Sequence, residues 1–308
     1  MLKILEGSRA IAETIKSIGV DVVSAYPITP QTHIVEELAK IKADGEANFE
    51  YVRAESEFAA ASIVEGASAT GVRTYTATSS QGLLLMTEVL YNIAGMRLPV
   101  VMTDANRAIS APINIWNDQQ DSISVRDAGW IQMYVENIQE AVDFHPIAYK
   151  LAEHKSIMLP VMVCMDGFIL THGIESVDMP SQEQVDKFLP PYKALYKVDV
   201  DKPMTLGPLV DPDSYMEARY AIQETHKDVL KMIPEMAAEF GKIFGRQYNG
   251  LIEEYKVKDA DKVIVAMGSV CGSIKDVIDE LRSKGKKVGL LKHLTDTEVC
   301  FLVLRVNQ

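Results

Sequence analysis

Polar residues follow four predicted strands of this 308-residue chain, at points where a strand ends and a helix begins. These segments are residues 26–32, 54–57, 76–82 and 104–107. In an open parallel sheet, ligands bind beyond the carboxyl ends of the strands. Helix N-termini add backbone N–H groups that have no partner within the helix. The four segments therefore predict one crevice that receives polar side chains and backbone donors.

Taken singly, each candidate residue in this crevice also has an ordinary structural explanation. Thr29 is placed to cap a helix that has Pro30 at its first position. Glu57, in a first helical turn, would complement the helix dipole. Arg107 would serve equally well as a surface charge or an ion-pair partner. From residue types and spacing alone we infer a fold and a crevice, but not a reaction.

The surrounding sequence predicts a parallel α/β sheet, because helical and strand patterns alternate with short turns over the first 170 residues. We expect Ser8 to cap the first helix and Gly19 to end it. Asn137 and Glu140 resemble a capping box for a later helix. Residues 108–130 fit neither pattern and are predicted to form a long ordered loop.

We divide the chain into three parts. Residues 1–178 form the parallel-sheet domain, residues 179–258 a proline-rich linker and a long helical connection, and residues 259–308 a second α/β unit. The linker is placed by its prolines, since residues 178–215 hold six of the 13 in the chain, and such clusters mark loops.

The composition excludes several classes of protein. Lysine and arginine number 31 against 43 aspartates and glutamates, which gives a formal net charge of −12. A nucleic-acid partner or an anionic membrane surface would require a basic face instead. No apolar run approaches the roughly 18 residues of a membrane span, and the N-terminus lacks the apolar region of a signal peptide. We therefore expect a cytoplasmic protein with no nucleic-acid or membrane partner.

Metal and nucleotide motifs are also absent from the sequence. Cys164, Cys271 and Cys300 lie far apart without a C-x-x-C pair, so they cannot hold an iron–sulfur cluster or a typical zinc site. The six histidines form no H-x-x-x-H or H-E-x-x-H pair, so no metal centre is expected. Residues 268–272 resemble a phosphate-binding turn but lack the G-x-G-x-x-G spacing. Nucleotide binding is therefore the weakest hypothesis.

Six short motifs, taken together, indicate a family. In chain order they are YPITP at 26–30, ESE at 55–57, TATSSQGLLLM at 76–86, ANRA at 105–108, NDQQD at 117–121 and DGF at 166–168. With these motifs in order and spacing over roughly residues 1–292, the chain resembles the alpha subunit of the 2-oxoacid:ferredoxin oxidoreductase family, and the pyruvate:ferredoxin oxidoreductases (pyruvate synthases) in particular.

The resemblance implies a fold, an activity and a set of partners. The first domain would be a pyrimidine-type thiamine diphosphate-binding domain, and the second a transketolase C-terminal-like domain. The activity would be reversible oxidative decarboxylation of pyruvate to acetyl-CoA and CO2. Thiamine diphosphate would be shared with a beta subunit, and Mg²⁺ and the [4Fe–4S] clusters would lie in partner subunits rather than in this chain. Partners would be the beta, gamma and delta subunits, ferredoxin, coenzyme A and the 2-oxo acid.

The resemblance also assigns roles to residues. Glu57 matches the catalytic glutamate that hydrogen-bonds N1′ of the cofactor's aminopyrimidine, and this bond relays general acid–base catalysis through the cofactor. Arg107 matches the arginine that receives the substrate carboxylate, for which a guanidinium is the preferred partner. Thr29 matches the threonine that orients the same group. Pro27 and Ile28 would line the cofactor pocket by backbone and apolar contact.

Three alternatives stay open. The same chemistry on a branched-chain 2-oxo acid or on 2-oxoglutarate would need a wider pocket or a second cation. A non-catalytic α/β scaffold would have no need of Thr29, Glu57 and Arg107 together.

After Lys292 the sequence departs from the family's R-x-F-R-P-F-P stretch into an apolar tail. We therefore expect a second domain that is incomplete through truncation or a frame shift.

Overall fold

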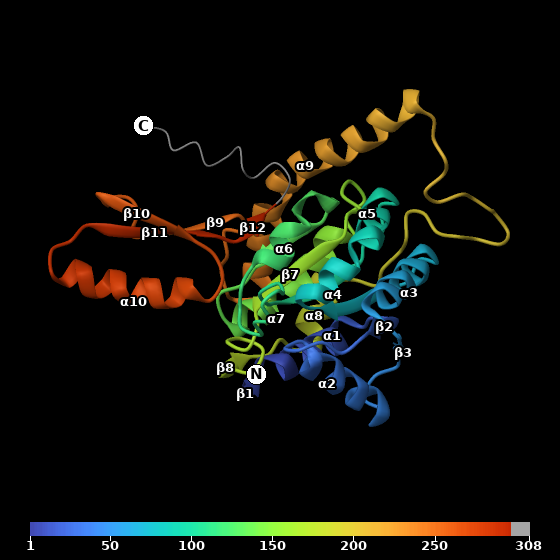
Figure 1. The fold of residues 1–308 in the computed structure, drawn as a ribbon. Coiled ribbons are helices and arrows are strands. Elements are labelled where there is room, and N and C mark those ends of the chain that lie inside the picture. Colours follow the sequence, from blue (N-terminus) through green and yellow to red (C-terminus); the bar gives the residue numbers. More distant parts are fainter. Residues whose placement is uncertain (297–308) are drawn as a thin grey trace.

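A seven-stranded sheet forms the centre of the structure, a computed structural model that describes residues 1–296. The apolar tail, within residues 297–308, lies outside the described residues. The strand order is β12-β6-β7-β5-β4-β2-β3, with every neighbouring pair parallel except β12 and β6. The strands are β2 (Val22–Ala25), β3 (Glu50–Arg53), β4 (Thr74–Thr78), β5 (Val101–Asn106), β6 (Ile131–Tyr134), β7 (Val161–Asp166) and β12 (Thr295–Asp296). The predicted α/β parallel-sheet fold is confirmed (Figure 1).

Helices cover both faces of this sheet, because alternate residues of each buried strand point to opposite faces. On β5, Val101 packs into one core cluster and Met102 into the other. One face is covered by α1 (Gly7–Ile18), α2 (Thr32–Ala43), α7 (Ile138–Ala152), α8 (Gln182–Phe188) and α9 (Pro212–Phe244). The other carries α3 (Glu57–Ala69), α4 (Ser80–Leu85) and α5 (Thr87–Gly95). No helix within residues 1–296 is both long and apolar enough to cross a membrane.

The ends of α1 follow the sequence only in part. Gly19 ends the helix as predicted, in the left-handed conformation with φ of 72°. The prediction that Ser8 caps it is wrong, because the helix already begins at Gly7 and the Ser8 hydroxyl donates to the carbonyl of Thr171, 2.8 Å away. A Cβ at Gly7 would lie 1.9 Å from the Leu170 carbonyl oxygen, so only glycine fits where α1 meets the segment after β7.

The caps of α2 and α7 also differ from expectation. Thr29 does not cap α2, which begins three residues later with Gln31 at the N-cap position. Asn137 does cap α7 by accepting from the backbone N–H of Glu140 at 2.8 Å. The reciprocal half of the capping box is missing, because the Glu140 carboxylate accepts from the backbone of Glu136 instead.

Several elements were not predicted from the sequence patterns. Residues 108–130, predicted as a loop, contain helix α6 (Gln120–Ser124) and a 3₁₀ turn over Arg126–Ala128. Strand β6 and the antiparallel pair β1 (Leu2–Glu6) and β8 (Ile174–Asp178) were not predicted either. These segments are short, and their conformation depends on tertiary neighbours more than on local propensity.

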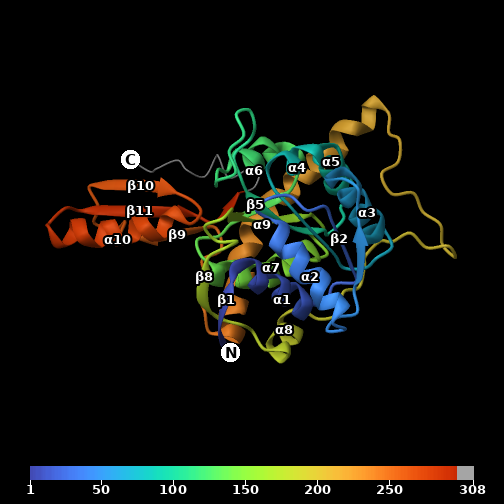
Figure 2. The same cartoon turned by 60° about the horizontal axis from the view of Figure 1, so that its bottom comes forward.

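A smaller three-stranded sheet follows α9, in the order β10-β11-β9. It consists of β9 (Ile252–Tyr255), β10 (Lys262–Ala266) and β11 (Val288–His293), and α10 (Val270–Ser283) packs against it. Both views show this second unit projecting from the main body (Figures 1 and 2). The three-part division of the chain remains a prediction, and its boundary at residues 258/259 falls between β9 and β10.

A buried lysine joins the second unit to the main sheet domain. The Lys292 side chain is completely buried, and its ammonium lies 2.6 Å from Glu136, 2.5 Å from Glu140 and 3.3 Å from Glu253. Burial alone would lower the pKa of Lys292, but Glu140 and Glu136 raise it above its ordinary value. Lys275 adds a second cation beside Glu136 and Glu253. Two ammonium groups therefore offset most of the charge of the three carboxylates.

Replacing Lys292 with Met should destabilise the docked second unit, because Glu140 would lose its ammonium partner and Glu136 and Glu253 would keep only Lys275. We expect the free energy of unfolding to fall by about 3–5 kcal/mol, measured by denaturant unfolding, with earlier proteolysis in the 245–251 connection. The matched control is Lys284→Met, since Lys284 forms an exposed pair with Glu280 and should change stability by less than about 1 kcal/mol. Equal effects of the two substitutions would contradict the role assigned to Lys292.

Candidate functional site

The four predicted segments converge at the carboxyl edge of the central sheet. Thr29 follows β2, Glu57 begins α3 after β3, Gln81 lies in α4 after β4, and Arg107 directly follows β5. The Arg107 guanidinium connects three of these segments, since Nη1 donates to the Thr29 carbonyl at 2.8 Å and Nη2 to Gln81 Oε1 at 2.6 Å. The predicted site residues are therefore brought together around a buried arginine.

Glu57 occupies the first position of α3, where Ser56 caps the helix by accepting from the Ala59 N–H at 3.1 Å. The Glu57 side chain is buried, with 7% exposed, and lies against Gly82. A Cβ at Gly82 would be 2.8 Å from Glu57 Oε1 and 2.6 Å from Thr78 Oγ1. Within residues 1–296 the Glu57 carboxylate receives no hydrogen bond, so its acceptor capacity is available to a ligand.

Arg107 is buried as deeply as Glu57, and the charge of the Glu57 carboxylate acts on its guanidinium. Burial lowers the pKa of Arg107 from its ordinary value, while the charges of Asp121 and Glu57 oppose that shift. Its Nε is buried and has no hydrogen-bond partner in the part of the chain that the structure describes. An unpaired N–H on a buried cation suits a bound anion, and the unpaired Glu57 carboxylate beside it suits a ligand group that donates a hydrogen bond.

Asp121 holds the ends of β4 and β5 together. Its Oδ2 accepts from the backbone N–H groups of Ser80 and Arg107, each at 2.9 Å, and its Oδ1 accepts from the Asn106 amide at 2.9 Å. Asn106 also donates to Asp104 Oδ2 at 2.8 Å. The conformation of Ser80, with φ of 50°, is strained for a residue other than glycine, so its N–H contact with Asp121 supports the turn.

Two buried carboxyl groups therefore lie side by side under the crevice. Burial, and then the neighbouring Asp121, raise the pKa of Asp104 well above its ordinary value. Burial also raises the pKa of Asp121, against the lowering effect of the Asn106 amide. The ionised form is better supported at Asp121 than at Asp104, because Asp121 accepts four hydrogen bonds within the network. The NDQQD motif pointed to this segment, but gave no role for its last residue.

The remaining predicted residues lie nearer the surface. Thr29 contacts Arg107 through its carbonyl rather than its hydroxyl, and its side chain is exposed. Pro27 is exposed and Ile28 half-buried. Gln31 supports this segment, because its side chain accepts from the Ile28 N–H at 3.2 Å and donates to the Ala77 carbonyl at 2.6 Å.

The turn at residues 268–272 is already occupied by a carboxylate. The backbone N–H of Ser269 donates to Asp166 Oδ2 at 2.8 Å, and its hydroxyl contacts the same oxygen. Gln119 donates to the other oxygen at 2.9 Å, and a Cβ at Gly268 would lie 2.8 Å from it. The donors that a nucleotide phosphate would need therefore bind the end of β7.

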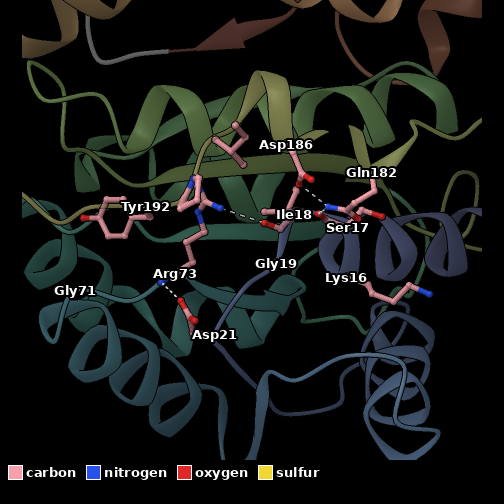
Figure 3. Close-up of a pocket in the computed structure, with 12 residues that line it drawn as sticks. Lys16, Ser17, Ile18, Gly19, Asp21, Gly71, Arg73, Gln182, Asp186 and Tyr192 are labelled. Atoms are coloured by element: carbon pink, nitrogen blue, oxygen red, sulfur yellow. Dashed lines mark hydrogen bonds between the residues drawn. The ribbon is translucent and has the colours of Figure 1, made fainter. Parts of the chain in front are cut away.

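A cavity of about 580 Å³ lies at the opposite, amino-terminal edge of the sheet (Figure 3). Asp21, Arg73 and Tyr192 are among the residues that line it. The Arg73 N–H donates to Asp21 at 2.8 Å, and its guanidinium pairs with Glu153 at 2.7 Å. Because these groups are paired within the protein, they offer less to a ligand than the Glu57 carboxylate and Arg107 Nε, which have no hydrogen-bond partner among the described residues.

Comparison with known proteins establishes the family. Residues 13–238 match the thiamine diphosphate-binding domain of pyruvate flavodoxin/ferredoxin oxidoreductases, and residues 260–295 match core domain II of pyruvate:ferredoxin oxidoreductase. The chain belongs to the pyruvate flavodoxin/ferredoxin oxidoreductase family, as the six motifs indicated. This membership confirms both the resemblance and the fold class.

The chain covers different shares of the length of the individual relatives that it matches. Pyruvate synthase subunit PorA of Methanothermobacter thermautotrophicus is 55% identical over 95% of this chain and 76% of the relative. Ketoisovalerate oxidoreductase subunit VorA of Pyrococcus abyssi is 47% identical over 94% of this chain and 73% of the relative. A solved 2-oxoglutarate:ferredoxin oxidoreductase from Magnetococcus marinus shares the fold, with a TM-score of 0.70 at 21% identity, over 94% of this chain and 53% of that chain.

Replacing Gly82 with Ala should disturb the crevice without unfolding the protein. The added Cβ would displace Glu57 and Thr78, so we expect cofactor-dependent activity of the assembled enzyme to fall at least about tenfold, while circular dichroism stays unchanged. Gly66→Ala, on the same helix as Glu57 and with no atom within 4 Å of its Cβ, is the control. It should keep full activity and gain up to about 1 kcal/mol in stability. Full activity of the Gly82 variant would show that Glu57 tolerates displacement.

Proposed function

We propose that this chain is the alpha subunit of a pyruvate synthase, a pyruvate:ferredoxin oxidoreductase. Pyruvate, coenzyme A and two oxidised ferredoxins would give acetyl-CoA, CO2, two reduced ferredoxins and one proton, reversibly. The single observation that carries the proposal is the pairing at the carboxyl edge. There, among the described residues, Glu57 offers a buried acceptor without a donor, and Nε of Arg107 is a buried donor without an acceptor.

The residues of the crevice fit the aminopyrimidine end of thiamine diphosphate. When bound, the cofactor supplies a nucleophilic carbon and an electron sink for decarboxylation. Glu57 would accept a hydrogen bond from N1′ of the ring and hold the proton at that atom, which a buried carboxylate does more strongly than an exposed one. Pro27 and Ile28, which follow β2, would line the pocket on one side of the ring.

Arg107 and Thr29 would hold the substrate. The guanidinium retains N–H groups beyond the two that bind the Thr29 carbonyl and Gln81, and a carboxylate is its preferred partner. The exposed hydroxyl of Thr29 would orient the carboxylate or the neighbouring oxo group. Together these contacts would place the carbon atom that is attacked and would shield the scissile bond from water.

The division of cofactors among subunits is also part of the proposal. Cys164 and Cys271 are both buried and lie in different units of the fold, which does not suit cluster ligation. The [4Fe–4S] clusters, and the Mg²⁺ with the cofactor's diphosphate, would be held by the beta, gamma and delta subunits. Coenzyme A and ferredoxin would bind to the complex, and free buried thiols are consistent with a cytoplasmic location.

A second candidate substrate is the branched-chain acid 2-oxoisovalerate, since relatives named ketoisovalerate oxidoreductase are 47% identical to this chain. Pyruvate is favoured because relatives named pyruvate synthase are 50–55% identical over similar lengths. A non-catalytic scaffold role is disfavoured, because it gives no reason to leave the Glu57 carboxylate and Arg107 Nε buried without hydrogen-bond partners among the described residues.

The proposal is tested with the complex purified with its own partner subunits. Reduction of methyl viologen in the presence of coenzyme A should be faster, in kcat/KM, with pyruvate than with 2-oxoisovalerate or 2-oxoglutarate. Preference for either of the other acids would transfer the function to that substrate. No reduction with any of the three would refute the proposed chemistry.

Within that complex, Glu57→Gln should abolish turnover, because an amide cannot hold the proton at N1′. The specific measurement is the exchange of the cofactor's C2 proton with deuterium, followed by NMR after acid quench, which we expect to slow by at least about a hundredfold. Glu65→Gln, farther along α3, is the matched control and should exchange at the wild-type rate. Unchanged exchange in the Glu57 variant would be incompatible with its assigned role.

A further inference from the structure

We propose that Gln81 is a second donor to the substrate carboxylate, beside Arg107. This inference rests on the proposed function and adds a substrate-binding residue that the sequence motifs did not assign. Gln81 is the second residue of α4, at the end of the segment that follows β4. It reaches the crevice from the opposite side to Thr29, with the Arg107 guanidinium between them.

The orientation of the Gln81 amide is fixed by its neighbours. Oε1 accepts from Arg107 Nη2 at 2.6 Å and lies 2.6 Å from the Ser80 hydroxyl. The flipped amide would place an NH₂ group against the guanidinium, donor against donor, so only one orientation is satisfied. Nε2 is bonded to the same carbon as this oxygen, and therefore lies next to Arg107.

That nitrogen has no partner in the protein. Gln81 Nε2 is buried and makes no hydrogen bond to any described residue, and Arg107 Nε is in the same condition. Buried donors are nearly always paired, and leaving one unpaired costs about 1–3 kcal/mol. Two such donors on adjacent side chains, one of them cationic, indicate a missing acceptor with two oxygens.

A 2-oxo acid supplies this acceptor. Its carboxylate is planar and presents two oxygens to the guanidinium and the amide, while Glu57, across Gly82, would repel it from the cofactor end. Gln81 then has two tasks: Oε1 holds the guanidinium of Arg107 in position, and Nε2 donates to the substrate.

Two substitutions separate these tasks. Gln81→Glu keeps an oxygen for Arg107 but replaces the donor with a second oxygen, whereas Gln81→Met removes both. In the complete complex we expect Gln81→Glu to raise KM for pyruvate at least tenfold, with KM for coenzyme A unchanged and deuterium exchange at C2 of the cofactor at the wild-type rate. Gln81→Met should weaken pyruvate binding as well. Gln223→Glu, on α9, is the control and should match the wild type.

The outcomes distinguish this proposal from the proposed function. A wild-type KM for pyruvate in Gln81→Glu, in a complex that oxidises pyruvate normally, would refute the donor role and leave the function standing. If Gln81→Met alone is impaired, Gln81 only positions Arg107. Slowed C2 exchange in Gln81→Glu would also overturn the inference, because the defect would then lie in the cofactor site.

A separate cluster outside the crevice carries a second inference. The structure assigns a site for one divalent transition-metal ion to Glu6, His33 and His172. One ligand atom from each lies within 4.8 Å of the other two, and the three residues come from the end of β1, the start of α2 and the turn after β7. Because they are distant in sequence, no spacing motif could have revealed them. Two imidazoles and a carboxylate are a typical set for Zn²⁺, Co²⁺ or Ni²⁺.

Neighbouring groups prepare these side chains for metal binding. Thr171 Oγ1 lies 2.7 Å from Nδ1 of His172, so an Nδ1–H donating to it would leave Nε2 free for an ion. Glu6 lies 2.6 Å from Nδ1 of His33, and the two imidazole rings are 4.4 Å apart. By contrast, the Glu136, Glu140 and Glu253 group surrounds the Lys292 ammonium and offers a cation no place.

The test uses the full chain stripped with EDTA and titrated with Co²⁺, followed by its visible d–d absorption and by calorimetry with Zn²⁺. We expect one equivalent to bind, and His33→Ala and His172→Ala each to weaken binding at least tenfold. His154→Ala, an exposed histidine elsewhere, should leave binding unchanged. No binding to the wild type, or equal binding to the His33/His172 double variant, would overturn the assignment.

Discussion

The crevice depends on one buried carboxylate, that of Asp121. Beyond their last paired residues, parallel strands have no backbone hydrogen bonds between them. Another interaction must therefore fix the ends of β4 and β5 relative to each other. Asp121 does so by accepting from the backbone of Ser80 and of Arg107 at once. The cost of burying this carboxylate is offset by the four hydrogen bonds that it accepts. Arg107 is thereby held at its backbone as well as at its guanidinium.

Much of this arrangement followed from the sequence. The alternation of patterns predicted the parallel sheet, and parallel strands necessarily bring Thr29, Glu57 and Arg107 to one edge. The caps were less predictable, because Ser8 and Thr29 have the residue types of N-caps, whereas tertiary contacts of Gly7 and Gln31 decide where α1 and α2 begin. Asp121 and Gln81 were beyond pattern reasoning, since their importance comes from which of their atoms find partners in three dimensions.

The second unit contacts the first through polar groups on two sides. The Ser269 turn binds Asp166 at the end of β7, and the buried Lys292 pairs with Glu136 and Glu140 near the start of α7. These are charge-assisted contacts, whose strength depends on geometry more than on area. Asp166 also accepts a hydrogen bond from the Gln119 side chain. The segment between β5 and α6 is therefore linked to the docking of the second unit.

The chain path adds a mechanical consequence. After leaving the main sheet at β7 and forming α9 and the small sheet, the chain returns as β12, which pairs with β6 at the sheet edge. The small sheet is thus tethered at both ends to the same rigid body rather than hanging from one linker. Two chain connections therefore restrain this unit, in addition to its contacts with Asp166, Glu136 and Glu140. Displacement of the small sheet relative to the main body would therefore act directly on the pairing of β12 with β6.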